Sequence, residues 1–267
     1  MTVKKLTLIS ALLITTILTA CDKQAPNNAD NSAQAEKVLH IGSTGQGYPN
    51  GFKQDGKLVG FDVETTEAIA KELGYKVEWI TIEFAGLMGQ LDAERLDTVA
   101  NAVAVTEARK AKYDFTQPYS YYGSQLVTHN ENENIRDYND LKGKMISGVL
   151  GSNHLNILKK VFPNNEVTIK TYETRDGAMY DLVYKRVDAY INSKPILLAE
   201  MKRSNLPFKL VGKPLVMEAV AYPFARNARG QQLREQFDQA LTKLKQNGTI
   251  KALSEKYYGE DITTPEQ

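Results

Sequence analysis

Hydrophobic and polar positions follow two different periods along residues 38–105. Residues 38–41, 76–82 and 99–105 are short runs rich in β-branched and small apolar side chains, which is typical of strands. Residues 61–73 and 84–91 place apolar side chains three and four positions apart, which is the spacing of an amphipathic helix. A repeated order of strand, helix and strand predicts an α/β sheet with parallel strands.

The second half of the chain repeats this arrangement. Residues 185–192, Lys-Arg-Val-Asp-Ala-Tyr-Ile-Asn, closely parallel residues 94–101, Glu-Arg-Leu-Asp-Thr-Val-Ala-Asn. Both segments return from a predicted helix into an apolar strand that ends in Asn. Two returns of the same type indicate two similarly built lobes rather than one long sheet.

The chain is expected to cross between the lobes twice. The first crossover follows Pro118, and the apolar residues 217–224 lead back. Two closing helices, 231–244 and one that Thr249 caps, are expected to pack on the first lobe. We therefore predict a first lobe in residues 38–122 and 219–267 and a second lobe in residues 123–218.

The amino terminus has the composition of an export signal. Lys4 and Lys5 precede an apolar run that ends in Leu-Thr-Ala-Cys21, too short for a permanent membrane helix. This ending looks like a lipobox and predicts a lipoprotein signal peptide in residues 1–20, with Cys21 as the lipidated residue; a plain signal peptide is the alternative. Residues 21–37 contain almost no large apolar side chain and predict a disordered tether.

Composition and charge exclude several other functions. The chain has 267 residues, 42% hydrophobic and 24% charged, with 33 basic and 32 acidic side chains. Removing residues 1–20 takes away Lys4 and Lys5 and no acid, which leaves 31 against 32, so neither nucleic acid nor an anionic membrane surface is indicated. One Cys and three widely separated His residues predict no disulfide, metal site or cofactor.

One basic residue follows a predicted strand end. After residues 99–105, Thr106 begins a new helical turn that carries Arg109. Backbone groups at a strand end are unpaired, so the carbonyl of Ala102 and the amide of Ala104 can face a ligand beside a guanidinium that binds carboxylates bidentately. The residues alone leave a second interpretation open, a surface Arg after a core strand.

A second candidate anion site begins at Gly151. Ser152 and Asn153 precede apolar positions with helical spacing, so one of them is predicted to cap a helix whose free amides hold a carboxylate. A purely structural cap is the alternative. The Gly-rich residues 42–47 lack both the dinucleotide spacing and a Lys-Ser/Thr pair, so phosphate binding is not expected.

Residues 106–119 have the form Thr-Glu-x-Arg-x-x-x-Tyr-Asp-Phe-Thr-x-Pro-Tyr. This run resembles the signature of the family 3 bacterial extracellular solute-binding proteins, the receptors of polar amino-acid ABC importers, and is most similar to the cystine-binding members. The resemblance extends over about residues 38–263. It implies a type II periplasmic-binding-protein fold: α/β, two lobes, each a mostly parallel sheet flanked by helices, and two crossover segments.

The resemblance also implies further ligand contacts. An aromatic side chain of the first loop stacks on the ligand in the family, and Tyr48 and Phe52 are the candidates, although this loop is shorter than the usual pattern. Phe84 stands where the cystine-binding members carry a Trp, with a core Phe as the alternative. Asn101 and Ser193 end the two corresponding strands and are expected at the cleft.

Ser193 departs from the family pattern, because most members place there an Asp that pairs with the ligand's α-ammonium. We expect the ammonium to be bound instead by the Ala102 carbonyl, the Ser193 hydroxyl and an acid such as Glu218, with a cation–π contribution from Phe84 or Tyr48. The competing hypothesis is a ligand without an ammonium, a small carboxylic acid.

The expected function is that of a substrate-binding lipoprotein of an ABC importer. It would capture a polar amino acid, cystine in the first place, by lobe closure and deliver it to the permease. A monomer is expected, held in the cell envelope by its lipid anchor and facing the periplasm or the cell exterior, with no nucleic-acid partner and no enzyme activity. The alternatives are a dehydratase-like enzyme on the same fold, with Glu83 or Glu218 as an acid, and a sensor or adhesin.

Overall fold

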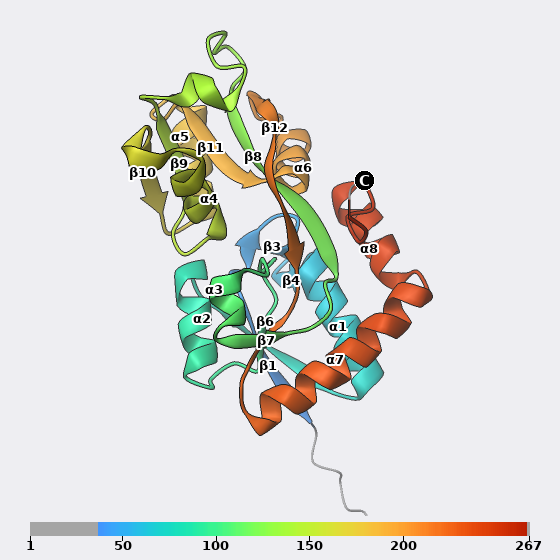
Figure 1. The fold of residues 1–267 in the computed structure, drawn as a ribbon. Helices are drawn as coiled ribbons and strands as arrows, with labels where there is room; N and C mark the ends of the chain where they lie inside the picture. The colour runs from blue at the N-terminus through green and yellow to red at the C-terminus, as the bar shows by residue number, and fades with distance from the viewer. Residues whose placement is uncertain (1–36, 266–267) are drawn as a thin grey trace, which may run out of the picture. The chain divides into compact units, whose positions relative to one another are not determined.

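The computed structural model describes residues 37–265. The predicted signal peptide, Cys21 and all of the predicted tether except Lys37 lie outside these residues. The described chain forms two groups of strands and helices that correspond to the two lobes expected from the sequence, and β8 and β12 run side by side between them (Figure 1).

The first lobe is built on a parallel sheet of three strands in the order β5-β1-β6. Each connection between these strands contains a helix, as the alternating periods predict. Helix α1 ends at Gly74, whose φ of 70° lies in the left-handed region that Gly adopts freely. The elements are β1 (Val38–Ser43), α1 (Phe61–Leu73), β5 (Lys76–Thr81), α2 (Phe84–Asp92) and β6 (Thr98–Val99).

Smaller elements complete the first lobe. Three short antiparallel strands, β2, β3 and β4, form the loop region after β1, and β7 pairs with β13. The two closing helices α7 and α8 pack against α1, as expected (Figure 1). The bounds are β2 (Gln46–Gly47), β3 (Gly51–Gln54), β4 (Lys57–Val59), α3 (Glu107–Lys110), β7 (Tyr113–Phe115), β13 (Pro223–Ala225), α7 (Ala228–Gln246) and α8 (Thr249–Tyr258).

The second lobe has five strands in the order β10-β9-β11-β8-β12. The first three are parallel, whereas β8 is antiparallel to both of its neighbours, so the sheet is mixed. The reason is that β8 carries the chain into this lobe and β12 carries it back. The bounds are β8 (Ser120–His129), β9 (Met145–Val149), β10 (Thr168–Tyr172), β11 (Ala189–Ser193) and β12 (Phe208–Val220).

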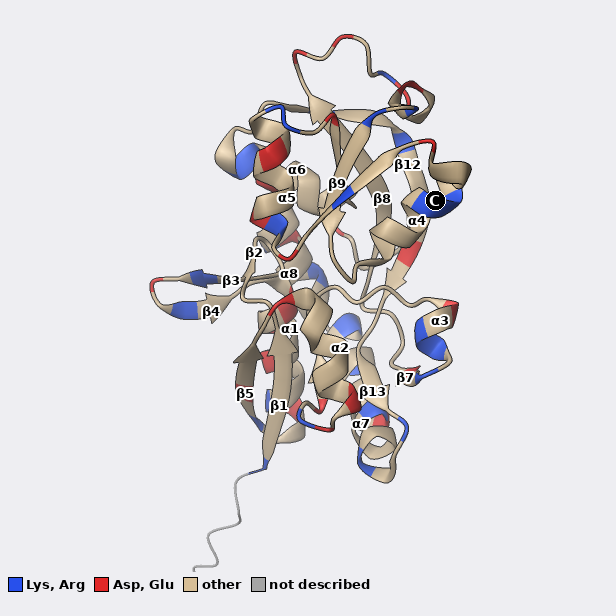
Figure 2. Ribbon diagram, turned by 90° about the vertical axis from the view of Figure 1, so that its left-hand side faces the viewer, with Lys and Arg blue, Asp and Glu red and all other residues tan. Residues whose placement is uncertain are grey.

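Helices cover this sheet. Figure 2 shows basic and acidic segments interspersed along α5 and α6. Helix α6 begins directly after β11 with Lys194 and Pro195, and Pro is well tolerated in the first turn because its missing N–H has no partner there. The bounds are α4 (Asn153–Val161), α5 (Arg175–Val183) and α6 (Lys194–Ser204), with the 3₁₀ turns η1 (Tyr138–Leu141) and η2 (Pro163–Asn165).

Two expectations about local structure are wrong. Thr249 does not cap α8: the cap position is Gly248, and the side chain of Asn247 accepts a hydrogen bond from the Thr249 amide at 3.0 Å. Residues 99–105 are not one strand, because Ala102 adopts a left-handed φ of 48°. The strand ends at Val99, and pairing resumes only as an isolated bridge between Ala104 and Val220.

Two helical glycines provide a matched test of the packing. A Cβ on Gly230 of α7 would lie 2.0 Å from the carbonyl oxygen of Ala225, whereas a Cβ on Gly89 of α2 would meet nothing within 4 Å. Gly230→Ala should therefore destabilise the protein by about 1–3 kcal/mol through overpacking. Gly89→Ala should stabilise it by about 0.5–1 kcal/mol, because Ala loses less backbone entropy in a helix. Urea unfolding of both variants checks this, and equal effects would contradict the packing at Gly230.

Candidate functional site

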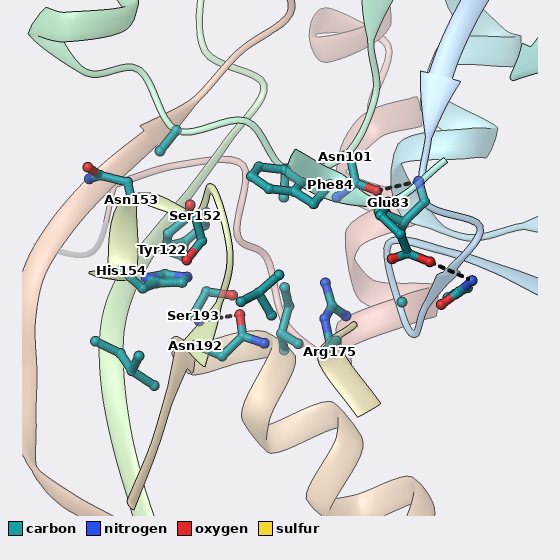
Figure 3. A pocket seen from close by; sticks show the side chains of 18 of the residues that line it. Glu83, Phe84, Asn101, Tyr122, Ser152, Asn153, His154, Arg175, Asn192 and Ser193 are labelled. Carbon is teal, nitrogen blue, oxygen red and sulfur yellow. Dashed lines mark hydrogen bonds between the residues drawn. The ribbon is translucent and has the colours of Figure 1, made fainter. Parts of the chain in front are cut away.

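A cavity that is partly open to solvent lies among the strand ends and helix starts of both lobes. Its lining includes Gln46 and Glu83 from the first lobe and Arg175 and Asn192 from the second (Figure 3). Eight of the ten predicted ligand-binding residues line it: Phe84, Asn101, Ala102, Ala104, Arg109, Ser152, Asn153 and Ser193. Side chains separated by up to about half the chain therefore meet in one concave site, as ligand sites require.

The remaining two predicted residues, Tyr48 and Phe52, do not line the cavity. Phe52 is 8% exposed within the core of the first lobe, and its ring lies edge-on to that of Tyr48 at 5.1 Å. The guanidinium of Arg203, from α6, lies 4.3 Å from the Tyr48 ring centroid and 5.1 Å from that of Phe52. Both rings are therefore engaged elsewhere, and Phe84 is the predicted aromatic residue that borders the cavity.

Arg109 reaches across the site from α3. The hydroxyl of Thr106 accepts a hydrogen bond from the Arg109 amide at 3.2 Å and so fixes the start of this short helix. The guanidinium donates to the carbonyl of Ala104 at 3.0 Å and to that of Gly151, in the second lobe, at 3.3 Å. Burial lowers the pKa of Arg109, and the charge of Glu218 opposes this effect. A carboxylate ligand would supply the negative charge that two carbonyl oxygens do not.

The bridge to β12 orients the backbone of residues 103–105, which precedes the helix that carries Arg109. The amide of Val105 donates to the Ala219 carbonyl at 2.8 Å, and the carbonyl of Val103 accepts from the Ala221 amide at 3.2 Å. In an antiparallel bridge the peptide groups of the intervening residue point the opposite way. The amide and carbonyl of Ala104 are therefore turned away from β12, consistent with its place in the cavity lining.

Asp62 supports this backbone from behind and is a residue that the sequence analysis missed. Its fully buried carboxylate accepts hydrogen bonds from the Ala102 amide at 2.8 Å, the Tyr119 hydroxyl at 2.9 Å and the Asn50 side chain at 3.1 Å. Burial raises the pKa of Asp62 to about 6 despite these bonds. An acid in the first turn of a helix is ordinary, since it favours the dipole, so its position gave no signal.

Two buried hydroxyls in the lining have no hydrogen-bond partner. They belong to Ser152, the residue before α4, and to Ser193, the last residue of β11. Ser152 marks the helix start as predicted, but its side chain makes no capping hydrogen bond. Leaving a buried polar group unpaired costs about 1–3 kcal/mol. A polar ligand would satisfy both hydroxyls and offset that cost.

A buried polar network lies beside these hydroxyls. The Glu218 carboxylate accepts from the Asn153 side chain at 2.6 Å and from the Ser124 hydroxyl at 2.5 Å. The same Ser124 oxygen lies 2.8 Å from Nδ1 of His154, which lines the cavity. Burial lowers the pKa of His154 to about 4, so its imidazole is neutral at pH 7. The sequence analysis missed Ser124 and His154.

Charged groups of both signs gather at another part of the lining. Glu83 accepts a hydrogen bond from Gln46 at 3.3 Å, and Glu173 lies at the same cavity. Arg175 donates to the Tyr48 carbonyl at 2.8 Å and lies 3.6 Å from Glu200. The Glu200 charge raises the pKa of Arg175 although burial acts in the opposite direction. This part of the cavity can hold a second polar or charged ligand group.

Comparison with known proteins identifies the family. The bacterial extracellular solute-binding proteins, family 3, match residues 39–260. The chain belongs to this family. The resemblance seen in residues 106–119 is confirmed, and so is the two-lobed type II fold, which solved family structures share.

Three relatives illustrate the range of this family of solute-binding proteins. A probable amino-acid-binding protein, YxeM of Bacillus subtilis, is 46% identical over 267 residues, with all of both chains covered. The L-cystine-binding protein TcyJ of Escherichia coli is 31% identical over 235 residues, 87% of each chain. An ancestral arginine-binding protein solved with arginine is 34% identical, with a TM-score of 0.78 over 84% of this chain and 99% of that one.

The described part of this solute-binding protein lacks two features that other classes of protein have. Within residues 37–265 there is no group of three or more His, Cys, Asp and Glu side chains that could hold a metal ion. No helix in that range combines the length and hydropathy that a membrane span needs.

The buried Asp62 carboxylate predicts a pH dependence of stability. Its pKa is about 6 in the folded protein against an ordinary 3.8, so the folded state binds the proton more tightly and loses stability as the pH rises from about 4 to about 6. Asp62→Asn cannot titrate. Relative to the wild type, the variant should gain about 2 kcal/mol between pH 4 and pH 7, on top of a constant cost for altered hydrogen bonds. Urea unfolding at both pH values measures this, and parallel stability profiles would refute it.

Proposed function

We propose that the chain is the substrate-binding lipoprotein of an ABC importer. It captures a polar α-amino acid between its two lobes, with cystine as the favoured candidate, and delivers this ligand to a permease. The observation that carries this proposal is the combination of Arg109 with the unpaired hydroxyls of Ser152 and Ser193 around one cavity. A carboxylate needs such donors when it leaves water.

Cystine is supported by the two polar parts of the cavity. The molecule carries an amino-acid group at each end of a disulfide. Arg109 offers a carboxylate site at one part of the lining, while Glu83, Glu173 and Arg175 offer both signs of charge at another. Phe84, whose ring centroid lies 5.9 Å from the Arg109 guanidinium, can pack against the apolar disulfide segment. The similarity to TcyJ agrees with this choice.

Lobe closure is the proposed capture step. The proposed lobes are residues 38–122 with 219–267 and residues 123–218, joined by β8 and β12. Hydrogen bonds from Arg109 to Gly151 and from Arg175 to Tyr48 connect the two sides of the cavity. A ligand that adds contacts to both sides would stabilise the closed state by its differential affinity. Lipidation at Cys21 and attachment to a membrane remain part of the proposal.

An enzyme on the same fold is the competing function. Acid catalysis needs a carboxyl group with a raised pKa within reach of the substrate. Burial raises the pKa of Asp62 to about 6 and that of Glu200 to about 7, but neither residue lines the cavity. This favours binding without chemistry.

Calorimetry with a panel of ligands tests the proposal. L-cystine, L-arginine and L-glutamine should be compared with deaminated analogues such as dithiodipropionic acid. A recognised ammonium is expected to improve affinity well over tenfold, or about 1.4 kcal/mol or more. Equal affinity for the deaminated acids would reject an amino-acid receptor and favour a receptor for small carboxylic acids. Conversion of any ligand during incubation, followed by mass spectrometry, would favour the enzyme.

Arg109→Ala should abolish useful binding and leave the fold intact. Truncating one partner of a buried charge pair costs about 2–5 kcal/mol, which is roughly 30-fold to several thousand-fold in affinity. Arg234→Ala is the matched control, because Arg234 is a first-lobe Arg that pairs with Asp238 on α7 at 2.8 Å and does not line the cavity. If Arg109→Ala binds the amino acid within threefold of the wild type, the carboxylate is held elsewhere.

A further inference from the structure

An amino acid brings an ammonium as well as a carboxylate, and a buried cation needs compensating acceptors. At the end of β11 the chain offers the amide of Asn192 and the hydroxyl of Ser193, neither of which is charged. Of the acids in the lining, Glu83 lies in the part of the cavity around Arg175, and Glu173 is two residues from Arg175 in the chain. The acceptor for the ammonium therefore has to be sought among the buried groups beside Ser193.

The Glu218 network determines where the protons lie. Ser124 is fully buried and its hydroxyl has a single proton, which the 2.5 Å distance assigns to the Glu218 carboxylate. The contact of 2.8 Å between the Ser124 oxygen and Nδ1 of His154 then requires a proton on Nδ1. A neutral imidazole has only one ring proton, so Nε2 of His154 is an acceptor.

Burial and nearby charges together keep the His154 ring neutral. The side chains near the ring are Glu218 on β12, Tyr122 on β8, Arg109 on α3 and Arg175 on α5. Burial is the largest effect and lowers the pKa of His154 to about 4, and the two arginines act in the same direction. The Glu218 charge opposes them.

Further acceptors adjoin the ring. The Asn192 side chain donates to the Tyr190 hydroxyl at 2.6 Å, and its oxygen accepts from the Ser193 amide at 2.8 Å. The Asn192 side chain is also a hydrogen-bond partner of the His154 ring, and this contact raises the pKa of His154. The unpaired Ser193 hydroxyl belongs to the next residue, and Figure 3 shows His154, Asn192 and Ser193 grouped on one side of the cavity. With the single ring proton on Nδ1, the ring offers Nε2 as an acceptor beside the Asn192 oxygen and the Ser193 hydroxyl, and three acceptors fit a donor with several N–H groups.

We infer that Nε2 of His154, together with the oxygens of Ser193 and Asn192, binds the α-ammonium of the ligand. Glu218 acts as a positioning residue: through Ser124 it fixes the Nδ1-protonated tautomer, and its carboxylate, 3.8 Å from Nδ1, adds a negative charge behind the ring. Ammonium binding is thereby assigned to a neutral imidazole backed by a buried acid. This assignment rests on the amino-acid function proposed above.

Calorimetry on paired variants tests the assignment of the ammonium to His154. Each variant is measured with two pairs of an amino acid and its deaminated analogue: L-cystine with dithiodipropionic acid, and L-arginine with guanidinovaleric acid. His154→Leu removes the acceptor and should reduce the preference for the amino acid over its deaminated analogue at least tenfold, while affinity for the analogue changes less than threefold. His154→Gln can still donate to Ser124 and present an oxygen, so it should recover much of the preference. The control is His40→Leu, a half-exposed His outside the cavity lining, which should leave the preference within threefold. Glu83→Gln, measured with L-arginine and guanidinovaleric acid, asks whether the acidic part of the cavity holds the α-ammonium instead.

Nitrogen NMR of the imidazole provides an independent readout. The His154 signals, identified by their loss in His154→Gln, should show a neutral ring protonated on Nδ1 at pH 7, and only Nε2 should shift strongly when the amino acid binds. Glu218→Gln should change the tautomer population without moving the His40 or His129 signals.

Three results would overturn the inference. A ring protonated on Nε2 contradicts the proton assignment even without ligand. If the preference for the amino acid persists in His154→Leu but disappears in Glu83→Gln, the ammonium is bound in the acidic part of the cavity. The amino-acid function would then still hold. A wild type with no preference for amino acids rejects the function and this assignment together.

Discussion

The antiparallel pairing of β8 with β12 is the constraint on which the site residues depend. In this register Tyr122 lies opposite Glu218 and Ser124 lies opposite Val216, so Ser124 is the diagonal neighbour of Glu218 on the same face. The same pair of strands holds the segment that leads into α3, and so Arg109, through the bridge from Val220 to Ala104. A slip of one residue would turn Ser124 and Glu218 to opposite faces and separate Glu218 from the proposed ammonium site. One ladder thus aligns the two parts of the cavity that are proposed to bind the carboxylate and the ammonium.

Electrostatics explains why this cavity suits a zwitterion. Arg109 is buried and its guanidinium is hydrogen-bonded to backbone carbonyls rather than to a carboxylate, while Glu218 and Asp62 lie behind neutral groups that relay their effect. A ligand with a single charge would satisfy one side and leave the other without compensation. A zwitterion satisfies both, and the two unpaired Ser hydroxyls make an empty closed site costly. The same features that weaken the empty site would therefore favour the proposed closure on an amino acid.

The sequence predicts the parts of this site that depend on local chemistry. Arg109 follows a strand and a Thr cap, Phe84 begins a helix, and Ser152 precedes one, so each position follows from propensity and spacing. The parts of the site that the sequence does not predict depend on partners that are distant in the chain. The left-handed turn at Ala102 is held by Asp62, 40 residues earlier, and Tyr48 is turned away from the cavity under Arg203. His154 is 30 residues from Ser124, and Ser124 is 94 residues from Glu218, so no local pattern brings the three together.

Selectivity among amino acids has to arise away from Arg109 and His154. The groups proposed to bind there contact the carboxylate and the ammonium, which every α-amino acid shares, so they add similar affinity for all of them. In the proposed orientation, the ligand's side chain ends around Glu83, Glu173 and Arg175, and differences between ligands would be decided there. Arg175 is already engaged by the Tyr48 carbonyl and by Glu200, so a ligand group must match the charge that this arrangement leaves uncompensated. A buried polar mismatch costs about 1–3 kcal/mol, enough to separate a cystine from a ligand with an apolar end by roughly fivefold to more than a hundredfold.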